Sequence, residues 1–287
     1  MGLRRRRLLT PYLLLLPGLA WLVVFFGVPA LNQLYVSLQD GNFEIGYTFQ
    51  WNWSTYSDAI SQYDEQFLRS LRYAGTATVL AFGISFPLAY FIAFKAGRWK
   101  NLMLLLIILP FFTSYLMRTV AWQTILSDNS FVTERLKDVG LVAGDGRLLA
   151  TTTAVVAGIT YNFLPFMALP LYVALERIDR SLIEAATDLY ASRWQAFRRV
   201  TLPLALPGIF AGTLLTFIPA VGDFINAQIL GTSRQYMIGN VIQSKFLVVT
   251  DYPAAAALSF LLMAALLICV FVYARVLGAR NLEEAVV

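Results

Sequence analysis

The feature that most constrains this chain is a set of six apolar stretches, each about 20 residues or more in length, which is enough to cross a bilayer. They cover residues Pro11–Leu34, Tyr73–Phe94, Leu102–Leu126, Thr151–Leu175, Pro207–Leu230 and Ala254–Val276. A backbone in lipid must satisfy its own hydrogen bonds, and barrel strands would alternate and be about half as long. The sequence therefore predicts an all-α integral membrane protein with six transmembrane helices.

Composition agrees with this class and excludes others. Apolar residues make up 58% of the chain and charged residues 14%, against roughly 25% charged residues in soluble domains. The chain has no histidine and one cysteine, so it lacks the residues of the usual metal sites and the commonest general base. No phosphate-binding loop of the GxxxxGK type occurs either. We therefore expect no metal site and no cofactor in this chain.

The positive charges predict the orientation in the membrane. Fourteen of the 22 Lys and Arg residues lie on the N-terminal side of the membrane if six helices span it. The positive-inside bias then places both termini, and the loop at residues 177–206, in the cytoplasm. Arg4–Arg7 are interpreted as a topology anchor on anionic lipid. The net charge of +5 thus requires no nucleic-acid partner.

The loop at residues 177–206 carries the signals of two short helices. Ser181-x-x-Glu184 and Ser192-x-x-Gln195 both match the capping box. A turn is expected near Tyr190; since tyrosine is strained at positive φ, this turn is expected to be tighter or more helical than a glycine turn. Glu184 is either a cap on a solvated helix or part of a docking surface. The Leu202-Pro203 ending and the membrane context favour docking.

This loop resembles the EAA loop of permeases from ATP-binding-cassette (ABC) importers. The matching residues are Glu184, Ala185 and Ala186, then Val200, Leu202 and Pro203, with Tyr190 where the family usually has glycine. Other segments are similar to the first-type permease of the spermidine/putrescine branch. They are Leu109–Leu116 with Arg118 and Trp122, Tyr161–Phe166 with Pro170–Tyr172, and Phe217–Phe224 with Gly231, Gly239, Asn240, Phe246 and Asp251–Pro253.

The resemblance implies a type I importer permease with one membrane domain over residues 1–287 and core helices at about 70–276. Such a chain is a non-catalytic subunit of the bacterial inner membrane. It would pair with a sister permease, with two ATPase subunits that bind ATP and Mg²⁺, and with an extracytoplasmic binding protein that delivers a polyamine. The implied ATPase-docking residues are Glu184, Ala185, Ala186, Tyr190, Leu202 and Pro203.

Two ionisable residues are predicted to lie within the membrane. Arg118 and Asp223 each lie 16 residues beyond the inner end of a predicted span, so a rise of about 1.5 Å per residue puts both about 24 Å from that edge. Asp223 is then either an ion-pair partner of Arg118, a cation-binding residue of the pathway, or an interfacial residue. With Trp122 and Tyr161 nearby, a carboxylate would suit an amine cargo.

Two weaker patterns have alternative interpretations. Residues 39–67 mix tryptophans and tyrosines with acids, as in interfacial anchors or in a surface that receives a binding protein. The helix-loosening residues Pro165, Pro170, Pro219 and Gly222 either line the pathway or only shape packing.

Other functions remain open at this stage. Within the importer class, the cargo could instead be an organic anion, a sugar or an iron complex. An ion-driven carrier or a channel would need no ATPase, but the inverted repeats and the midplane acids of a carrier are not apparent. A membrane enzyme is disfavoured because the sequence offers no convincing pair of nucleophile and base.

Overall fold

A computed structural model describes residues 14–140 and 146–278, with side chains up to residue 275. Arg4–Arg7 lie outside these residues, and the orientation in the membrane stays a prediction. The chain divides into two compact units, one with residues up to 62 and residues 242–263, the other with residues 63–241 and those after 263. A single membrane domain over residues 1–287 would have to include both units, and it stays a prediction.

The first unit begins with a helix over Leu14–Ser37, which includes a π-helical turn at Val23–Gly27 and continues as α2 (Val28–Ser37). A hairpin follows, in which β1 (Gln39–Asn42) pairs antiparallel with β2 (Gly46–Phe49). Five aromatic rings then contact one another in series: Tyr35, Phe49, Trp51, Trp53 and Tyr56. Trp51 and Trp53 remain 64% and 59% exposed. Both interpretations of this aromatic segment stay predictions.

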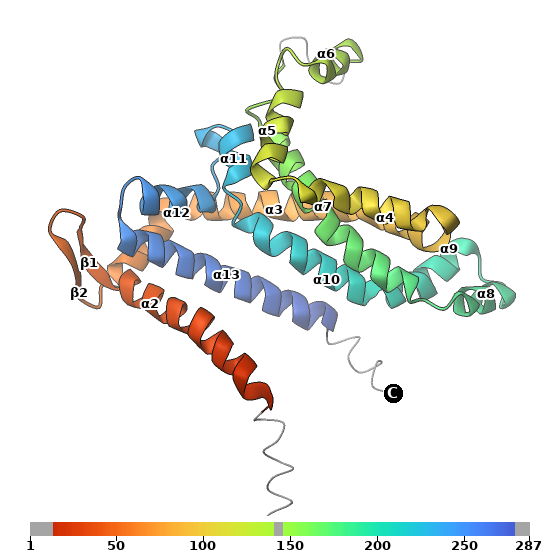
Figure 1. Ribbon diagram of the computed structural model, residues 1–287, viewed down its shortest axis with the longest axis horizontal. Coiled ribbons are helices and arrows are strands. Elements are labelled where there is room, and N and C mark those ends of the chain that lie inside the picture. Colours follow the sequence, from red (N-terminus) through yellow and green to blue (C-terminus); the bar gives the residue numbers. More distant parts are fainter. Residues whose placement is uncertain (1–13, 141–145, 279–287) are drawn as a thin grey trace, which may run out of the picture. The chain divides into compact units, whose positions relative to one another are not determined.

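Helices make up nearly all of the regular structure that follows (Figure 1). They are α3 (Ser54–Phe94), α4 (Lys100–Ile108), α5 (Tyr115–Ile125), α6 (Phe131–Asp138), α7 (Thr152–Glu176), α8 (Arg180–Asp188), α9 (Arg193–Ala196), α10 (Leu202–Val221), α11 (Ile225–Leu230), α12 (Ile238–Leu247) and α13 (Tyr252–Gly278). Short 3₁₀ turns lie at Gly97–Trp99, Leu109–Phe112 and Ser233–Gln235, and a π-helical turn at Phe197–Thr201 joins α9 to α10. Helical geometry is interrupted within α3 at Tyr63, where the two units divide.

The described residues contain five helices long and apolar enough to span a membrane, and a bent pair that can form a sixth span. The predicted fourth span is confirmed as Thr152–Glu176. The third is not one straight helix, since Gly97–Phe112 and Tyr115–Ile125 meet at 96°. Pro110 shapes the 3₁₀ turn before this bend, and Thr113 is extended. The fifth span runs over Arg193–Val221, and Gly222–Phe224 separate it from α11.

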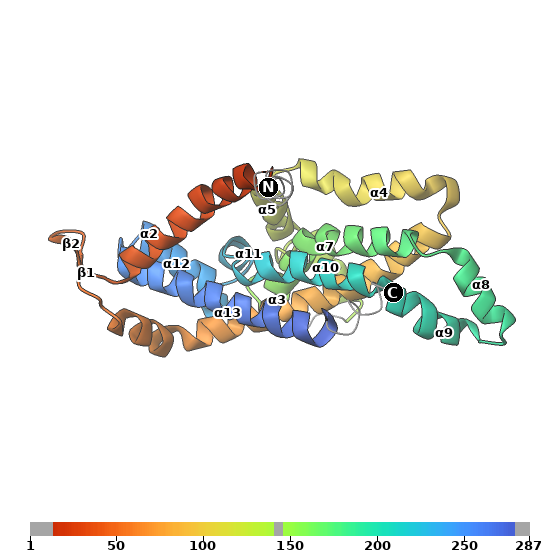
Figure 2. The ribbon, with the colours of Figure 1, turned by 90° about the horizontal axis from the view of Figure 1, so that it is seen from below.

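The core of the second unit lies between α3, α7 and α10. Figures 1 and 2 both place α7 and α10 side by side along their length. The buried core cluster comprises Ala81, Phe86, Ala89, Ala93, Met167, Leu171, Leu175, Ile178 and Ala205. Two glycines of α10 allow the close approach: a Cβ on Gly208 would lie 2.7 Å from the Pro170 carbonyl oxygen, and one on Gly212 would lie 2.9 Å from the Met167 sulfur. Small residues are the usual means of bringing membrane helices into contact.

The close contact between α7 and α10 predicts that one added methyl group at this contact lowers the stability of the protein. In Gly208→Ala, the new Cβ would lie 2.4 Å from that of Ala174, so the two helices must separate. We expect the variant to lose about 1–3 kcal/mol of stability, the usual cost of overpacking. The matched control is Gly83→Ala in α3, whose Cβ would meet nothing within 4 Å and which is expected to be neutral or slightly stabilising. Thermal melting in detergent measures both, and equal melting temperatures would refute the close contact.

Candidate functional site

The first helix of the loop at residues 177–206, α8, is capped by a residue that the motif did not indicate. Asp179 is the N-cap, and its Oδ1 accepts a hydrogen bond from the Ser181 backbone amide at 2.9 Å. The predicted Ser181–Glu184 capping box is therefore wrong, because Ser181 already lies inside the helix. Hydrogen bonds from the amide and hydroxyl of Ser181 lower the pKa of Asp179. A carboxylate at this end also suits the helix dipole.

The side chains of α8 form two apolar stripes. Ile183 and Ala186, three residues apart, are half-buried, and Ile183 packs against the core cluster. Leu182, Ala185 and Leu189 form a second stripe at spacings of three and four, and all three are exposed. Leu189 retains 80% of its accessible surface. The helix thus has one apolar stripe against its own protein and a second apolar stripe that no described residue covers.

The turn after α8 is a Schellman motif with tyrosine at the position usually taken by glycine. The Ala191 amide donates to the Ala186 carbonyl at 3.1 Å, and the Tyr190 amide donates to the Thr187 carbonyl at 3.0 Å. Tyr190 itself has φ +63° and is 98% exposed. The expectation of a tighter or more helical turn is therefore wrong, because tyrosine adopts the left-handed conformation at some conformational cost. Its ring is fully presented to solvent.

The rest of the loop combines the second predicted cap with further packing. The Ser192–Gln195 capping box is confirmed at the start of α9. Trp194 is 68% exposed and stacks on Phe197. Pro203 is exposed in the first turn of α10, but Leu202 packs against the core cluster and does not face solvent.

We define the α8 face as the exposed residues Leu182, Glu184, Ala185, Leu189, Tyr190 and Trp194. Leu182, Leu189 and Trp194 were missed by the motif, although helical spacing around Ala185 indicates the first two. The face is firmly attached to the membrane helices. Arg180 donates to the Ala93 carbonyl at the end of α3 at 3.3 Å and lies over the Phe94 ring.

Within the membrane region, Asp223 lies in the interruption between α10 and α11, not on a continuous helix. It is only 7% exposed. Its Oδ1 accepts hydrogen bonds from the Ile225 amide at 2.9 Å and the Asn226 amide at 3.2 Å. Its Oδ2 accepts from the Tyr115 hydroxyl at 2.7 Å and from the Asn226 side chain. Four donors thus occupy about the four acceptor positions of a carboxylate.

Arg118 does not form the ion pair with Asp223 that was one of the sequence interpretations. The sequence argument for a shared depth assumed two continuous helices, but Arg118 follows a 96° bend and Asp223 follows the end of α10. The Arg118 guanidinium instead lies over the Phe111 ring at 4.9 Å and the Tyr115 ring at 5.6 Å. Among the described residues, its buried Nε has no hydrogen-bond partner. Tyr115 therefore separates the two charges.

A buried amide connects this site to α7. Asn162 is 1% exposed, and its Nδ2 donates to Thr119 Oγ1 at 3.3 Å and to Asn226 Oδ1 at 3.2 Å. Asp223, Tyr115, Asn226, Asn162 and Thr119 thus form one buried network, which links α5, α7 and α11. Four of its members, Tyr115, Thr119, Asn162 and Asn226, were not predicted as site residues. The only sequence signals were a tyrosine one turn before Arg118 and amides within predicted spans.

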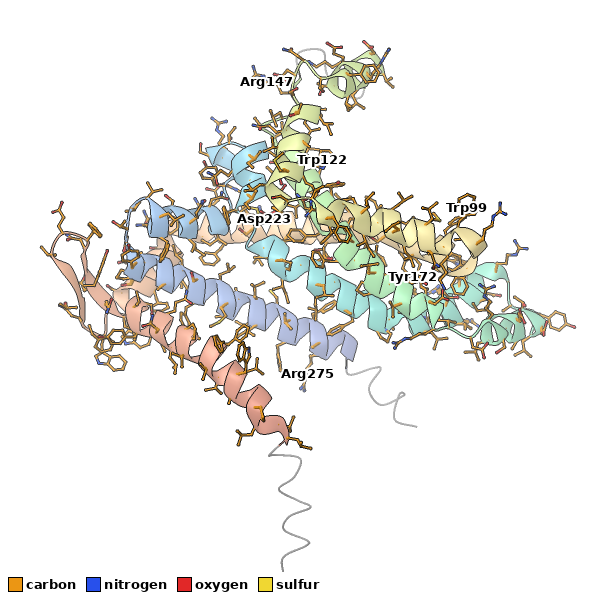
Figure 3. All side chains as sticks on the ribbon, viewed as in Figure 1. Trp99, Trp122, Arg147, Tyr172, Asp223 and Arg275 are labelled. Carbon is orange, nitrogen blue, oxygen red and sulfur yellow. The ribbon has the colours of Figure 1, made fainter. Side chains whose placement is uncertain are left out.

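The other predicted pathway residues lie together beside this network. Arg118 and Tyr161 line a cavity of about 410 Å³, and the Trp122 and Tyr161 rings are 5.4 Å apart. Figure 3 labels Trp122 on α5 and Asp223 after α10. The structure thus groups Arg118, Tyr161 and Trp122, and it connects Asp223 to them through Tyr115.

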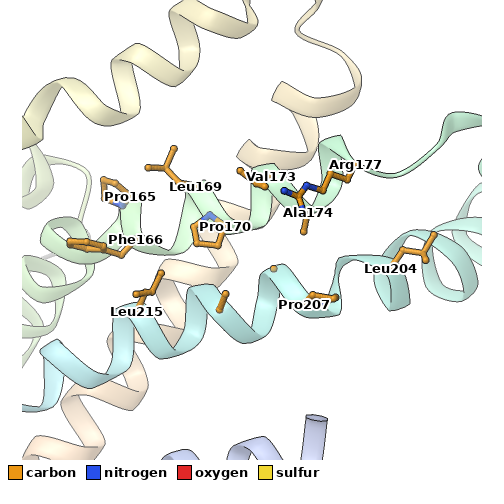
Figure 4. A pocket seen from close by; sticks show the side chains of 12 residues that line it. Pro165, Phe166, Leu169, Pro170, Val173, Ala174, Arg177, Leu204, Pro207 and Leu215 are labelled. Carbon is orange, nitrogen blue, oxygen red and sulfur yellow. The ribbon is translucent and has the colours of Figure 1, made fainter. Parts of the chain in front are cut away.

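A second cavity lies along α7 and α10 (Figure 4). It has a volume of about 570 Å³ and is lined by Pro165, Phe166 and Pro170 from α7 and by Pro207 and Leu215 from α10. Arg177 contributes the charged side chain of this lining. The prolines remain inside helices that continue past them, since α7 runs to Glu176 and α10 to Val221. Pro165 and Pro170 thus line this cavity, and Pro219 does not belong to its lining.

Comparisons with known proteins agree with these features. Residues 85–282 match the family model of the binding-protein-dependent transport system inner membrane component. The chain is 37% identical over 257 residues to the spermidine/putrescine transport system permease protein PotB of Haemophilus influenzae, covering 89% of this chain and 90% of the relative. It is 36% identical over 270 residues to PotB of Escherichia coli, covering 93% and 96%.

Solved structures show the same fold. A chain of a bacterial alginate ABC transporter, in complex with alginate pentasaccharide-bound periplasmic protein, superposes with a TM-score of 0.68 at 20% identity and covers 94% of both chains. A chain of the MetNI methionine ABC transporter gives a TM-score of 0.59 at 18% identity and covers 75% of this chain and 94% of that one. The protein therefore belongs to the family of binding-protein-dependent transport system inner membrane components, the multi-pass permeases of ABC importers.

Proposed function

We propose that this chain is the permease subunit that forms half of the translocation pathway of a polyamine ABC importer. The cargo is a spermidine- or putrescine-like cation. The observation that carries this proposal is the similarity to spermidine/putrescine permeases at 36–37% identity over about nine-tenths of the chain. ATP and Mg²⁺ belong to a partner ATPase dimer, and the remaining partners are a sister permease and an extracytoplasmic binding protein.

The α8 face supports the coupling step of this function. ATP-driven closure of the ATPase dimer moves the surface that holds Leu182, Ala185 and Leu189. Arg180 and Ile183 tie α8 to the membrane core, so the displacement reaches α3, α7 and α10. The network around Asp223 holds the broken helices together, because its acceptor positions are already occupied by protein donors. In this proposal the aromatic and cavity-lining residues near Tyr161 contact the cargo, and Asp223 positions the helices.

Reconstitution tests the proposal. Liposomes containing this chain, the sister permease and the ATPase, supplied with the loaded binding protein, are expected to accumulate labelled spermidine or putrescine only when ATP is present. This chain alone is expected neither to hydrolyse ATP nor to transport. ATP-dependent uptake by this chain alone would refute the subunit role. If the complex imports another solute but neither spermidine nor putrescine, the proposal of a polyamine cargo is wrong.

A further inference from the structure

The first unit contains a cavity that the proposed transport function does not use. It has a volume of about 420 Å³, and every described residue of its lining belongs to this one unit. The lining residues come from the C-terminal part of α2, the hairpin, the end of α12 and the start of α13. A volume of this order suits a small-molecule ligand.

Three aromatic rings form one wall of this cavity. The Tyr252 ring packs edge-on against Tyr47 at 5.6 Å and against Phe246 at 5.3 Å. The Tyr47 hydroxyl donates to the Thr250 carbonyl, which fixes this ring relative to the start of α13. Phe246 remains 53% exposed. Rings held in this way offer negatively polarised faces to a cation.

Three side-chain amides also line the cavity. Asn32, Gln33 and Gln39 line the cavity, and none of their side chains has a hydrogen-bond partner among the residues described. Asn32 and Gln33 belong to a helix long and apolar enough to span the membrane. Asn32 is exposed and Gln33 and Gln39 are half-buried, so a ligand can reach these amides and supply their missing hydrogen bonds.

Charge identifies the class of ligand. No acidic or basic side chain occurs among the described lining residues, and the nearby Lys245 and Asp251 pair with each other at 3.0 Å. The described part of this unit carries four carboxylates, Asp40, Glu44, Asp58 and Asp251, but one basic residue, Lys245. This excess of carboxylates among the described residues favours a cation over a phosphate headgroup; Arg4–Arg7 of the same unit lie outside the described residues.

We propose that this cavity binds an alkylammonium ion, with the ammonium group at the ring faces and amide oxygens and the methylene chain along the apolar wall. It shares no lining residue with the two cavities described in the second unit. The inference rests on the proposed function in one respect, because a polyamine belongs to the same chemical class. The site would then hold a cargo molecule, or a similar amine, between the C-terminal end of the Leu14–Ser37 helix and the start of α13.

Equilibrium dialysis of the purified permease–ATPase complex, without nucleotide or binding protein, tests this site. Labelled spermidine is the ligand, and n-butylammonium and n-butanol are the competitors. We expect n-butylammonium to compete and its neutral analogue not to compete. Phe246→Leu is expected to raise the Kd of the butylammonium-sensitive component about 5-fold or more, because a cation–π contact of about 1–2 kcal/mol is lost. Phe246→Tyr retains a ring face and is expected to bind normally.

The matched control is Phe43→Leu, since Phe43 is 70% exposed at the hairpin tip and does not line the cavity. Equal competition by n-butanol would overturn the proposal in favour of an apolar site. A co-purifying phospholipid that is lost in Phe246→Leu would overturn it in favour of lipid, and unchanged binding in this variant would overturn it outright. ATP-driven uptake by the same preparation tests the proposed function separately: uptake without this binding refutes the cavity site alone, and binding without uptake refutes the transport function alone.

Discussion

Ala185→Asp is expected to abolish stable association with the ATPase. Ala185 lies at the centre of the exposed stripe between Leu182 and Leu189, so docking would bury the new carboxylate without a partner. An uncompensated buried charge costs about 3–5 kcal/mol, which corresponds to an affinity loss of at least about 100-fold. Co-purification of the ATPase with the tagged permease, and binding of ATPase to the permease in nanodiscs, measure this loss.

The control is Thr187→Asp, an exposed residue of α8 two positions away and thus on the opposite side of the helix. It adds the same charge outside the stripe and is expected to leave association nearly unchanged. Loss of binding in both variants would mean that the charge acts through the loop as a whole. Retention in Ala185→Asp would mean that the ATPase docks elsewhere.

Asp223→Ala is expected to destabilise the membrane core strongly. The change removes the acceptor from the Tyr115 hydroxyl, from two backbone amides and from the Asn226 side chain. Each buried donor left without a partner costs about 1–3 kcal/mol, so we expect a total loss of about 3 kcal/mol or more. Thermal melting of the purified chain, and its yield from membranes, measure this effect.

Double-mutant cycles identify the partner of Asp223. The stability losses of Asp223→Ala and Tyr115→Phe should be coupled, because the two side chains share a hydrogen bond. Those of Asp223→Ala and Arg118→Ala should be nearly additive, because Arg118 packs on aromatic rings instead. Strong coupling to Arg118 would reinstate the ion pair. An Asp223→Asn variant that melts normally but transports poorly would instead favour the cargo-binding role.

Local sequence chemistry predicted the loop at residues 177–206 in part. The Ser192–Gln195 cap follows from a spacing of three residues and is present. The same spacing at Ser181 and Glu184 was misleading, because Asp179 two residues earlier has the extended conformation and the carboxylate that a cap requires. Tyr190 shows the opposite limit. A tyrosine at positive φ is strained, and this could be predicted from the residue type. The hydrogen bonds of the Tyr190 and Ala191 amides nevertheless hold the turn in the left-handed conformation.

The membrane class, the helical content and the position of the α8 loop were determined by the sequence alone, because hydropathy and capping are properties of neighbouring residues. The bend after Pro110, the end of α10 at Val221 and the partners of Asp223 depended on tertiary structure. Asp223 and Tyr115 lie 108 positions apart, and Asn162 and Asn226 lie 64 apart. Hydropathy measures how favourably a segment enters lipid, whereas these contacts depend on which helix faces meet, and that is decided only when α5, α7 and α11 pack together.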